Sequence, residues 1–152
     1  MKAQFSMARY EPFPMNKNGP IVVIEDDPDD RYLFEKVIRD ASVSNEVVMF
    51  EDGPSALEYL KQTDIYPFLI LSDVNLPKMD GFQIRKMVQT ADGLEEKCVP
   101  YLFISTSVSP ESVRKAYKMS VQGFFLKPNS IGELTSTLRL ILDYWSICYA
   151  PR

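Results

Sequence analysis

The chain alternates between short apolar runs and longer stretches in which apolar residues recur every three or four positions. The short runs, such as Ile21–Ile24, are rich in β-branched or aromatic residues and predict buried strands. The longer stretches have the spacing of one helix face, and Ser109-Pro110 supplies the cap residue and first-turn proline typical of a helix start. Strands are predicted over residues 21–24, 47–50, 68–71, 101–104 and 124–126, and helical stripes over 33–41, 56–60, 84–91, 113–117 and 134–145.

Five strands that alternate with five helices predict a single α/β domain. This order is typical of a parallel sheet with helices on both faces. In such sheets the functional site lies in the crevice at the carboxyl ends of the strands. The residues that directly follow each predicted strand are therefore the candidates for chemistry.

The predicted domain covers residues 20–148 and leaves a short segment at each end. Residues 1–19 contain two prolines and two asparagines and have little hydrophobic periodicity. We expect them to form an N-terminal extension that is partly disordered or packed on the domain. Residues 149–152 are expected to be a tail.

The composition excludes several classes of function. Lys and Arg number 17 against 21 Asp and Glu, a net charge of −4, so the chain is a poor candidate for non-specific nucleic-acid binding. It has no histidine, which excludes His-based catalysis and a phosphohistidine of its own. Its two cysteines form no CxxC motif. No apolar run is long enough to span a membrane and the N-terminus lacks a signal-peptide core, so we expect a cytoplasmic protein.

Polar groups of complementary charge follow four of the predicted strands. Glu25 and Asp26 follow the first strand, Asp73 the third, Ser105 the fourth and Lys127 the fifth. Two carboxylates ~4 Å apart repel by about 4 kcal/mol at an effective dielectric constant of ~20, so converging acids need a cation. Oxygen ligands without His or Cys favour a hard ion, above all Mg²⁺. A carboxylate beside Mg²⁺ and an amine can attack a phosphoryl group and become an aspartyl phosphate.

The remaining acids near these strand ends have simpler interpretations. Asp27, Asp29 and Asp30 stand where the first helix begins, so helix capping or solvation is the favoured role. Asp80-Gly81 is interpreted as a turn and a cap. A single Ser or Lys after a strand is usually an ordinary loop residue, and only the convergence of several polar groups at one crevice supports a functional site.

Four ordered motifs over residues 20–147 resemble the receiver domain of response regulators. IVVIEDD is similar to the family's first strand with its acidic pair, and LILSDVNLPKMDGFQI to its phospho-acceptor segment. LFISTS and GFFLKP are similar to the strands that end in a hydroxyl and in Lys-Pro. The resemblance implies a CheY-like, flavodoxin-like fold with five parallel strands in the order 2-1-3-4-5.

The resemblance implies a metal site and a phospho-acceptor. Asp73 would attack the phosphoryl group and would also be a ligand of Mg²⁺. Asp26 would bind the ion directly, Glu25 through a metal-bound water, and Asn75 through its main-chain carbonyl.

The resemblance also implies a switch. Lys127 would pair with one phosphoryl oxygen and Ser105 would move to hydrogen-bond another. Phe124 stands where the family often has an aromatic switch residue. The position is commonly Tyr, so Phe124 leaves packing alone to drive the change. Glu25 is a second departure, because Asp is commoner there.

The implied partners are a sensor histidine kinase or a phosphotransfer protein, which would present a phosphohistidine. The long connection over residues 91–99 and the EDDPDD opening are similar to stand-alone regulators paired with phytochrome-type or other hybrid sensor kinases. Because no DNA-binding region follows the last helix, output is expected through a protein target or a homodimer that uses the fourth helix, the fifth strand and the fifth helix. We expect a signalling protein with only weak self-phosphorylation and self-dephosphorylation, without nucleic-acid or membrane binding.

Two other functions use similar residues. A Mg²⁺-dependent phosphatase with an aspartyl nucleophile would use Asp27-Pro28-Asp29 as its Asp-x-Asp motif, but its acidic pair would come late in the chain. A flavodoxin-like flavin binder needs a hydroxyl- and Gly-rich phosphate loop after the first strand, where this chain has five acids in six positions.

Overall fold

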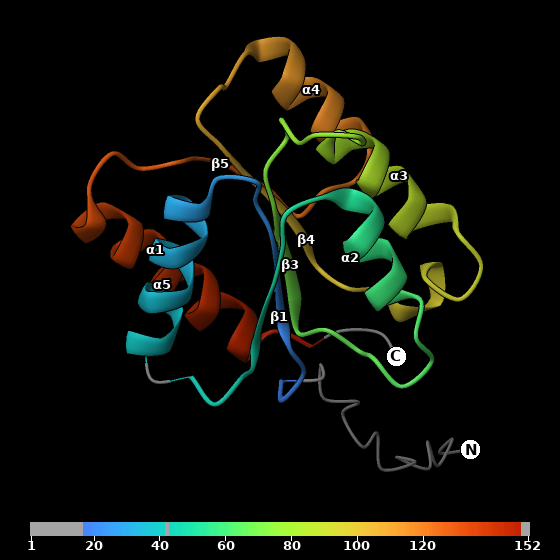
Figure 1. Ribbon diagram of the computed structural model, residues 1–152, viewed down its shortest axis with the longest axis horizontal. Helices are drawn as coiled ribbons and strands as arrows, with labels where there is room; N and C mark the ends of the chain where they lie inside the picture. The colour runs from blue at the N-terminus through green and yellow to red at the C-terminus, as the bar shows by residue number, and fades with distance from the viewer. Residues whose placement is uncertain (1–16, 42, 150–152) are drawn as a thin grey trace, which may run out of the picture.

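The computed structural model describes residues 17–41 and 43–149, and its elements follow the predicted order (Figure 1). Most of the predicted extension and most of the predicted tail lie outside these residues. The strands are β1 (Ile21–Ile24), β2 (Val47–Phe50), β3 (Leu69–Ser72), β4 (Tyr101–Ser105) and β5 (Gly123–Leu126). The helices are α1 (Pro28–Asp40), α2 (Gly53–Leu60), α3 (Gly81–Thr90), the 3-10 helix η1 (Glu95–Lys97), α4 (Pro110–Lys118) and α5 (Ile131–Ile147).

The five strands form one parallel sheet in the order β2-β1-β3-β4-β5. The predicted fold class and strand order are therefore confirmed. Ile24 pairs with Ser72 across β1 and β3, and Ser105 pairs with Leu126 across β4 and β5. These registers bring the carboxyl ends of distant strands to one edge of the sheet.

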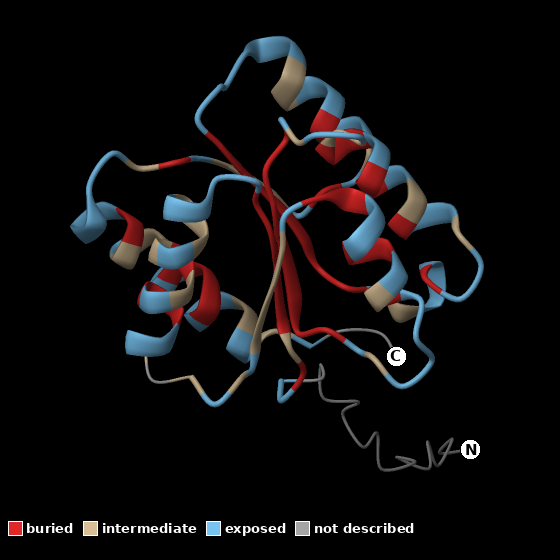
Figure 2. Ribbon diagram, viewed as in Figure 1, coloured by how far each residue is buried: buried red, intermediate tan, exposed pale blue. Residues whose placement is uncertain are grey.

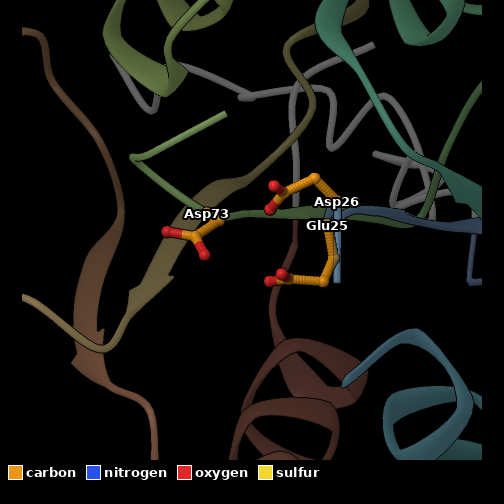
Figure 3. A group of neighbouring side chains, drawn as sticks. All are labelled: Glu25, Asp26 and Asp73. Carbon is orange, nitrogen blue, oxygen red and sulfur yellow. The ribbon is translucent and has the colours of Figure 1, made fainter. Parts of the chain in front are cut away.

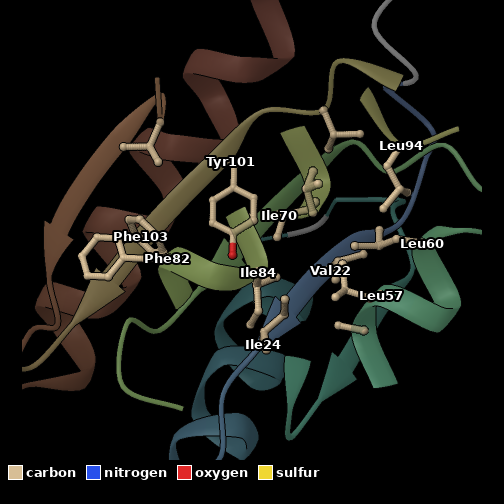
Figure 4. Packing of buried hydrophobic residues seen from close by; sticks show 14 of the residues in the cluster. Val22, Ile24, Leu57, Leu60, Ile70, Phe82, Ile84, Leu94, Tyr101 and Phe103 are labelled. Carbon is tan, nitrogen blue, oxygen red and sulfur yellow. The ribbon is translucent and has the colours of Figure 1, made fainter. Parts of the chain in front are cut away.

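Helices cover both faces of the sheet and bury one apolar cluster on each. α1 and α5 lie on one face, and α2, α3 and α4 lie on the other (Figure 1). The three inner strands are buried along their whole length, whereas β2 and β5 at the edges are mostly half-buried (Figure 2). Side chains from β1, β3 and β4 interlock with α2 and α3 in the larger cluster, which includes the fully buried Tyr101 (Figure 4). This double layer fixes the strands whose ends carry the polar residues.

Each long helix begins at a side chain that caps its first turn. Asp27 caps α1, Asp80 caps α3 and Ser109 caps α4, as predicted. Asp52 caps α2 by accepting from the backbone N–H of Ser55 at 2.9 Å, a role that the sequence did not reveal. No helix among the described residues is long and apolar enough to cross a bilayer.

The predicted third strand was one residue out of position. The prediction began at Phe68 because the apolar run begins there, but β3 ends at Ser72. Ser72 is fully buried, and its hydroxyl donates to the backbone carbonyl of Asp73 at 2.8 Å. A small hydroxyl that satisfies its own hydrogen bond can continue a buried strand, so apolar character alone misplaces the boundary.

The long connection between α3 and β4 folds into η1 and is held by one lysine. The amine of Lys97 donates to the backbone carbonyls of Leu60, Gln62 and Ile65 at 2.6, 2.7 and 2.6 Å. It also lies 5.3 Å from the ring centre of Tyr66. Lys97 therefore ties this connection to the loop that leads into β3.

Candidate functional site

The polar residues that follow β1, β3 and β5 are placed by the hydrogen-bond ladder of the sheet itself. The backbone N–H of Asp73 donates to the carbonyl of Ile24 at 3.0 Å, and that of Lys127 donates to the carbonyl of Ser105 at 2.7 Å. The N–H of Glu25 donates to the carbonyl of Phe50 at 2.9 Å. Each of these three residues is thus the first beyond its strand, and its backbone N–H still bonds to a neighbouring strand.

Three carboxylates converge at this edge. Glu25, Asp26 and Asp73 each offer an oxygen, and these three oxygens lie within 4.8 Å of one another. Figure 3 shows Glu25 and Asp26 reaching from the end of β1 toward Asp73. Glu25 is 2% exposed and Asp73 6% exposed, whereas Asp26 is open to solvent. The predicted juxtaposition of these acids is therefore present.

Lys127 supplies the positive charge of the site. Its amine lies 2.9 Å from Oε2 of Glu25 and 3.4 Å from Oδ2 of Asp73. Its third partner is Oδ2 of Asp30, at 2.9 Å. Burial lowers the pKa of the Lys127 amine, but the hydrogen bonds to Asp30 and Glu25 outweigh burial and hold that pKa above its usual value.

The pKa of the Glu25 carboxyl is also raised, which favours its neutral form. Burial is the largest cause and raises the pKa, the hydrogen bond and charge of Lys127 offset only part of that rise, and the negative charge of Asp73 adds to it, so that the pKa is about 7. A second cation at this edge would favour the ionised form. The donor set fits a hard divalent ion, because all three groups offer oxygen and one is already open to solvent.

The hydroxyl and aromatic residues predicted to act as a switch lie on β4 and β5, on the other side of β3 from β1. Ser105 is fully buried, and its Oγ accepts from the backbone N–H of Ser107 at 3.3 Å. The half-buried ring of Phe124 lies 5.8 Å from that of Phe103, centre to centre. Asn75 donates its backbone N–H to Oδ1 of Asp73 at 3.2 Å. The switch roles of Ser105 and Phe124, and the ligand role of the Asn75 carbonyl, stay predictions.

Close packing, in addition to the predicted turn, explains why position 81 is a glycine. A Cβ at this position would clash with the backbone oxygen of Asp73 and would lie 2.8 Å from the ring of Phe103. The start of α3 therefore approaches the Asp73 backbone as closely as only glycine allows. In this Asp-Gly pair, Asp80 caps α3 and Gly81 allows the close packing.

Two residues of α1 belong to the site although the sequence did not single them out. Asp30 reaches back to Lys127, as described above. Arg31 donates from Nη1 to the backbone carbonyls of Glu25 and Asp26, both at 2.8 Å, and so fixes the acidic loop. Asp30 was interpreted as a cap or a solvated acid; only Asp27 has the capping role. The available signal was the position of Asp30 in the first turn of α1, directly after the acidic loop that follows β1.

The structure gives Asp27 a capping role, which argues against its use as the nucleophile of an Asp-x-Asp phosphatase. Its Oδ1 accepts from the backbone N–H groups of Asp29 and Asp30 at 2.8 and 3.2 Å. Asp27 is thus engaged in capping α1, whereas Asp73 belongs to the carboxylate group and contacts the Lys127 amine.

The chain is similar in sequence and in structure to known proteins. A family model described as the response regulator receiver domain matches residues 21–139. Response regulator Rcp1 of Synechocystis sp. is 28% identical over 130 residues, which cover 82% of this chain and 87% of Rcp1. The crystal structure of the phosphorylated cyanobacterial phytochrome response regulator RcpA has a TM-score of 0.80 at 28% identity, covering 89% of this chain and 99% of RcpA.

The Mn²⁺-bound form of Rcp1 is also similar, with a TM-score of 0.77 at 25% identity over 88% of this chain and 99% of that one. The predicted resemblance to regulators of phytochrome systems is confirmed by these matches. The predicted cofactor, Mg²⁺, is confirmed for the family, and the carboxylates of Glu25, Asp26 and Asp73 form a group suited to such an ion.

Proposed function

Because this chain belongs to the response regulator receiver family, we propose that it is a phospho-acceptor of a two-component phosphorelay and that Asp73 is the acceptor. Receiver domains interact with histidine kinases or phosphotransfer proteins. The observation that carries the proposal is the position of Asp73, whose carboxylate is grouped with those of Glu25 and Asp26 and also lies 3.4 Å from the Lys127 amine. We assign the receiver unit to residues 20–148.

The proposed reaction moves one phosphoryl group from a partner's phosphohistidine to this chain. A carboxylate oxygen of Asp73 forms a bond to phosphorus while the P–N bond of the donor breaks and its electron pair returns to the imidazole. Lys127 neutralises charge on a phosphoryl oxygen. A bound Mg²⁺ would neutralise the other phosphoryl oxygens, with Asp26, Asp73 and the Asn75 carbonyl as direct ligands and Glu25 acting through water.

In the proposed output, phosphorylation changes the shape of one protein-binding surface. Ser105 would turn to hydrogen-bond a phosphoryl oxygen, and Phe124, whose ring already packs against Phe103, would change its rotamer in response. That change would alter the face formed by α4, β5 and α5, where Tyr117 and Leu126 are each 61% exposed. A target protein or a second copy of this chain would bind that face in one of the two states only.

The test is phosphorylation by acetyl phosphate with Mg²⁺, followed by intact-mass measurement. The wild-type chain is expected to gain one phosphoryl group, slowly lose it to water, and turn over no substrate beyond that. Asp73→Asn is expected to abolish the gain, whereas Asp92→Asn, on the exposed turn after α3, is expected to leave it unchanged. A gain that persists in Asp73→Asn would contradict the assignment of the acceptor.

A further inference from the structure

The Lys127 amine already has as many carboxylate partners as it has protons. An ammonium group offers three donors, and three acids surround this one: Glu25 and Asp30 at 2.9 Å and Asp73 at 3.4 Å. In the function proposed above, on which this inference rests, Lys127 must also bind a phosphoryl oxygen on Asp73. One carboxylate therefore has to give up its place.

The three carboxylates differ in how well each would be solvated or hydrogen-bonded after it leaves the amine. Asp73 carries the phosphoryl group, so it stays next to the amine. Glu25 is 2% exposed, and its release would leave a buried acid with only the backbone N–H of Asp27 at 3.2 Å. Asp30 is 30% exposed, so water can replace the amine as its partner. Release of Asp30 leaves the smallest desolvation penalty.

The surroundings of Asp30 allow this release. Its backbone is fixed in the first turn of α1 by the Asp27 cap, so only the side chain needs to rotate. A hollow of about 260 Å³ adjoins the pair and is lined by both Asp30 and Lys127, together with Thr106, Asn129 and Ser130. The rest of the lining is apolar, so the freed carboxylate and its water would lie on the side of the hollow formed by these polar residues.

We propose that Asp30 is a positioning residue that competes with the phosphoryl group for the Lys127 amine. In the unphosphorylated state it holds the amine closer to itself and Glu25 than to Asp73. Every phosphorylation has to break that bond, and every dephosphorylation re-forms it. Asp30 thereby lowers the affinity of the site for a phosphoryl group without touching that group.

The experiment measures Mg²⁺-dependent binding of beryllofluoride, a phosphoryl mimic, by fluorine NMR. Asp30→Asn removes the charge, Asp30→Glu keeps it, and Asp29→Asn removes an exposed charge one residue away. Asp30→Asn is expected to bind about fivefold more tightly than wild type, the size of one partly exposed charge-assisted hydrogen bond. Asp30→Glu and Asp29→Asn are expected to match wild type.

A double-mutant cycle with Lys127→Gln separates competition from general electrostatics. In that background Asp30→Asn is expected to have no effect, because the amine for which it competes is gone. An equal effect of Asp30→Asn and Asp29→Asn, or an effect that persists with Lys127→Gln, would overturn the role of Asp30. A wild-type protein that binds no beryllofluoride would overturn the proposed function as well, so the two failures are distinguishable.

Discussion

The carboxylate of Glu25 lies 2.9 Å from the amine of Lys127, although the two residues are 102 positions apart in the chain. Each is the first residue beyond a parallel strand. Although β3 and β4 lie between β1 and β5, the carboxyl ends of all these strands share one edge of the sheet, where the two long side chains reach each other. Both side chains are buried, so their charges depend on each other. This pair makes the site sensitive to the loss of either partner.

Removal of the Lys127 charge is expected to destabilise the domain and to make it depend on a metal ion. Lys127→Gln leaves Glu25 and Asp73 buried without their cation, and we expect a loss of about 2–3 kcal/mol in the free energy of unfolding. Saturating Mg²⁺ is expected to restore much of that loss, because it neutralises the same acids. Urea unfolding at pH 8 with EDTA and with Mg²⁺ measures both effects, and Lys86→Gln, on an exposed position, is the control. A loss that Mg²⁺ does not reduce would contradict the shared role.

The solvent-exposed acid is expected to decide metal affinity. Asp26→Asn removes one of the three converging carboxylates, and because hard divalent ions depend on charged oxygen ligands, we expect at least a tenfold loss of Mg²⁺ affinity by calorimetry. Asp27→Asn is the matched control, since Asn is an equally good N-cap and the residue is not among the three. Equal affinity of the two variants would remove Asp26 from the ligand set.

The sequence specified the fold well because the pattern and the packing agree. The apolar run Ile21–Ile24 predicted a strand, and all four of its residues are buried in the structure. The helix starts at Asp27, Asp80 and Ser109 were predictable because capping depends on local chemistry. The end of β3 at Ser72 was not predictable from apolar character, since Ser72 is polar but still pairs with Ile24 of β1, and the Asp73 carbonyl satisfies its buried hydroxyl.

The site residues that directly follow strands were predicted, whereas the site residue contributed by the first turn of α1 was not. Glu25, Asp73 and Lys127 each follow a strand, so topology alone brings them together. Asp30 stands in a run of acids in which any member is a plausible cap, and only the three-dimensional position of Lys127 distinguishes it. Outside the site, the structural role of the buried Arg85 was not predicted either. Arg85 donates to the backbone carbonyls of Met119 and Ser120 near the end of α4, and these partners lie 34 and 35 positions away in the chain.

The connection before β4 is expected to depend on one lysine. Lys97→Met keeps the length of the side chain but removes hydrogen bonds to three backbone carbonyls. Hydrogen bonds from a charged donor contribute about 1.5–3 kcal/mol each when well shielded, and the half-buried position of Lys97 reduces this. We expect a net loss of about 2 kcal/mol in the free energy of unfolding, measured with urea. A loss no larger than that of Lys86→Met would show that water replaces the amine.

The cap of α2 is expected to make stability depend on pH in the acid range. Hydrogen bonds from Ser55, followed by the Lys78 amine at 3.0 Å, lower the pKa of Asp52 to about 2 from its ordinary value of 3.8. A carboxyl with a lower pKa in the folded state stabilises that state fully above the unfolded value and loses its contribution as the pH falls through the folded value. The contribution of Asp52 is therefore expected to disappear between about pH 4 and pH 2. Urea unfolding over this range is expected to show a smaller decline for Asp52→Asn than for wild type, while Asp92→Asn follows wild type; parallel curves for Asp52→Asn and wild type would contradict the linkage.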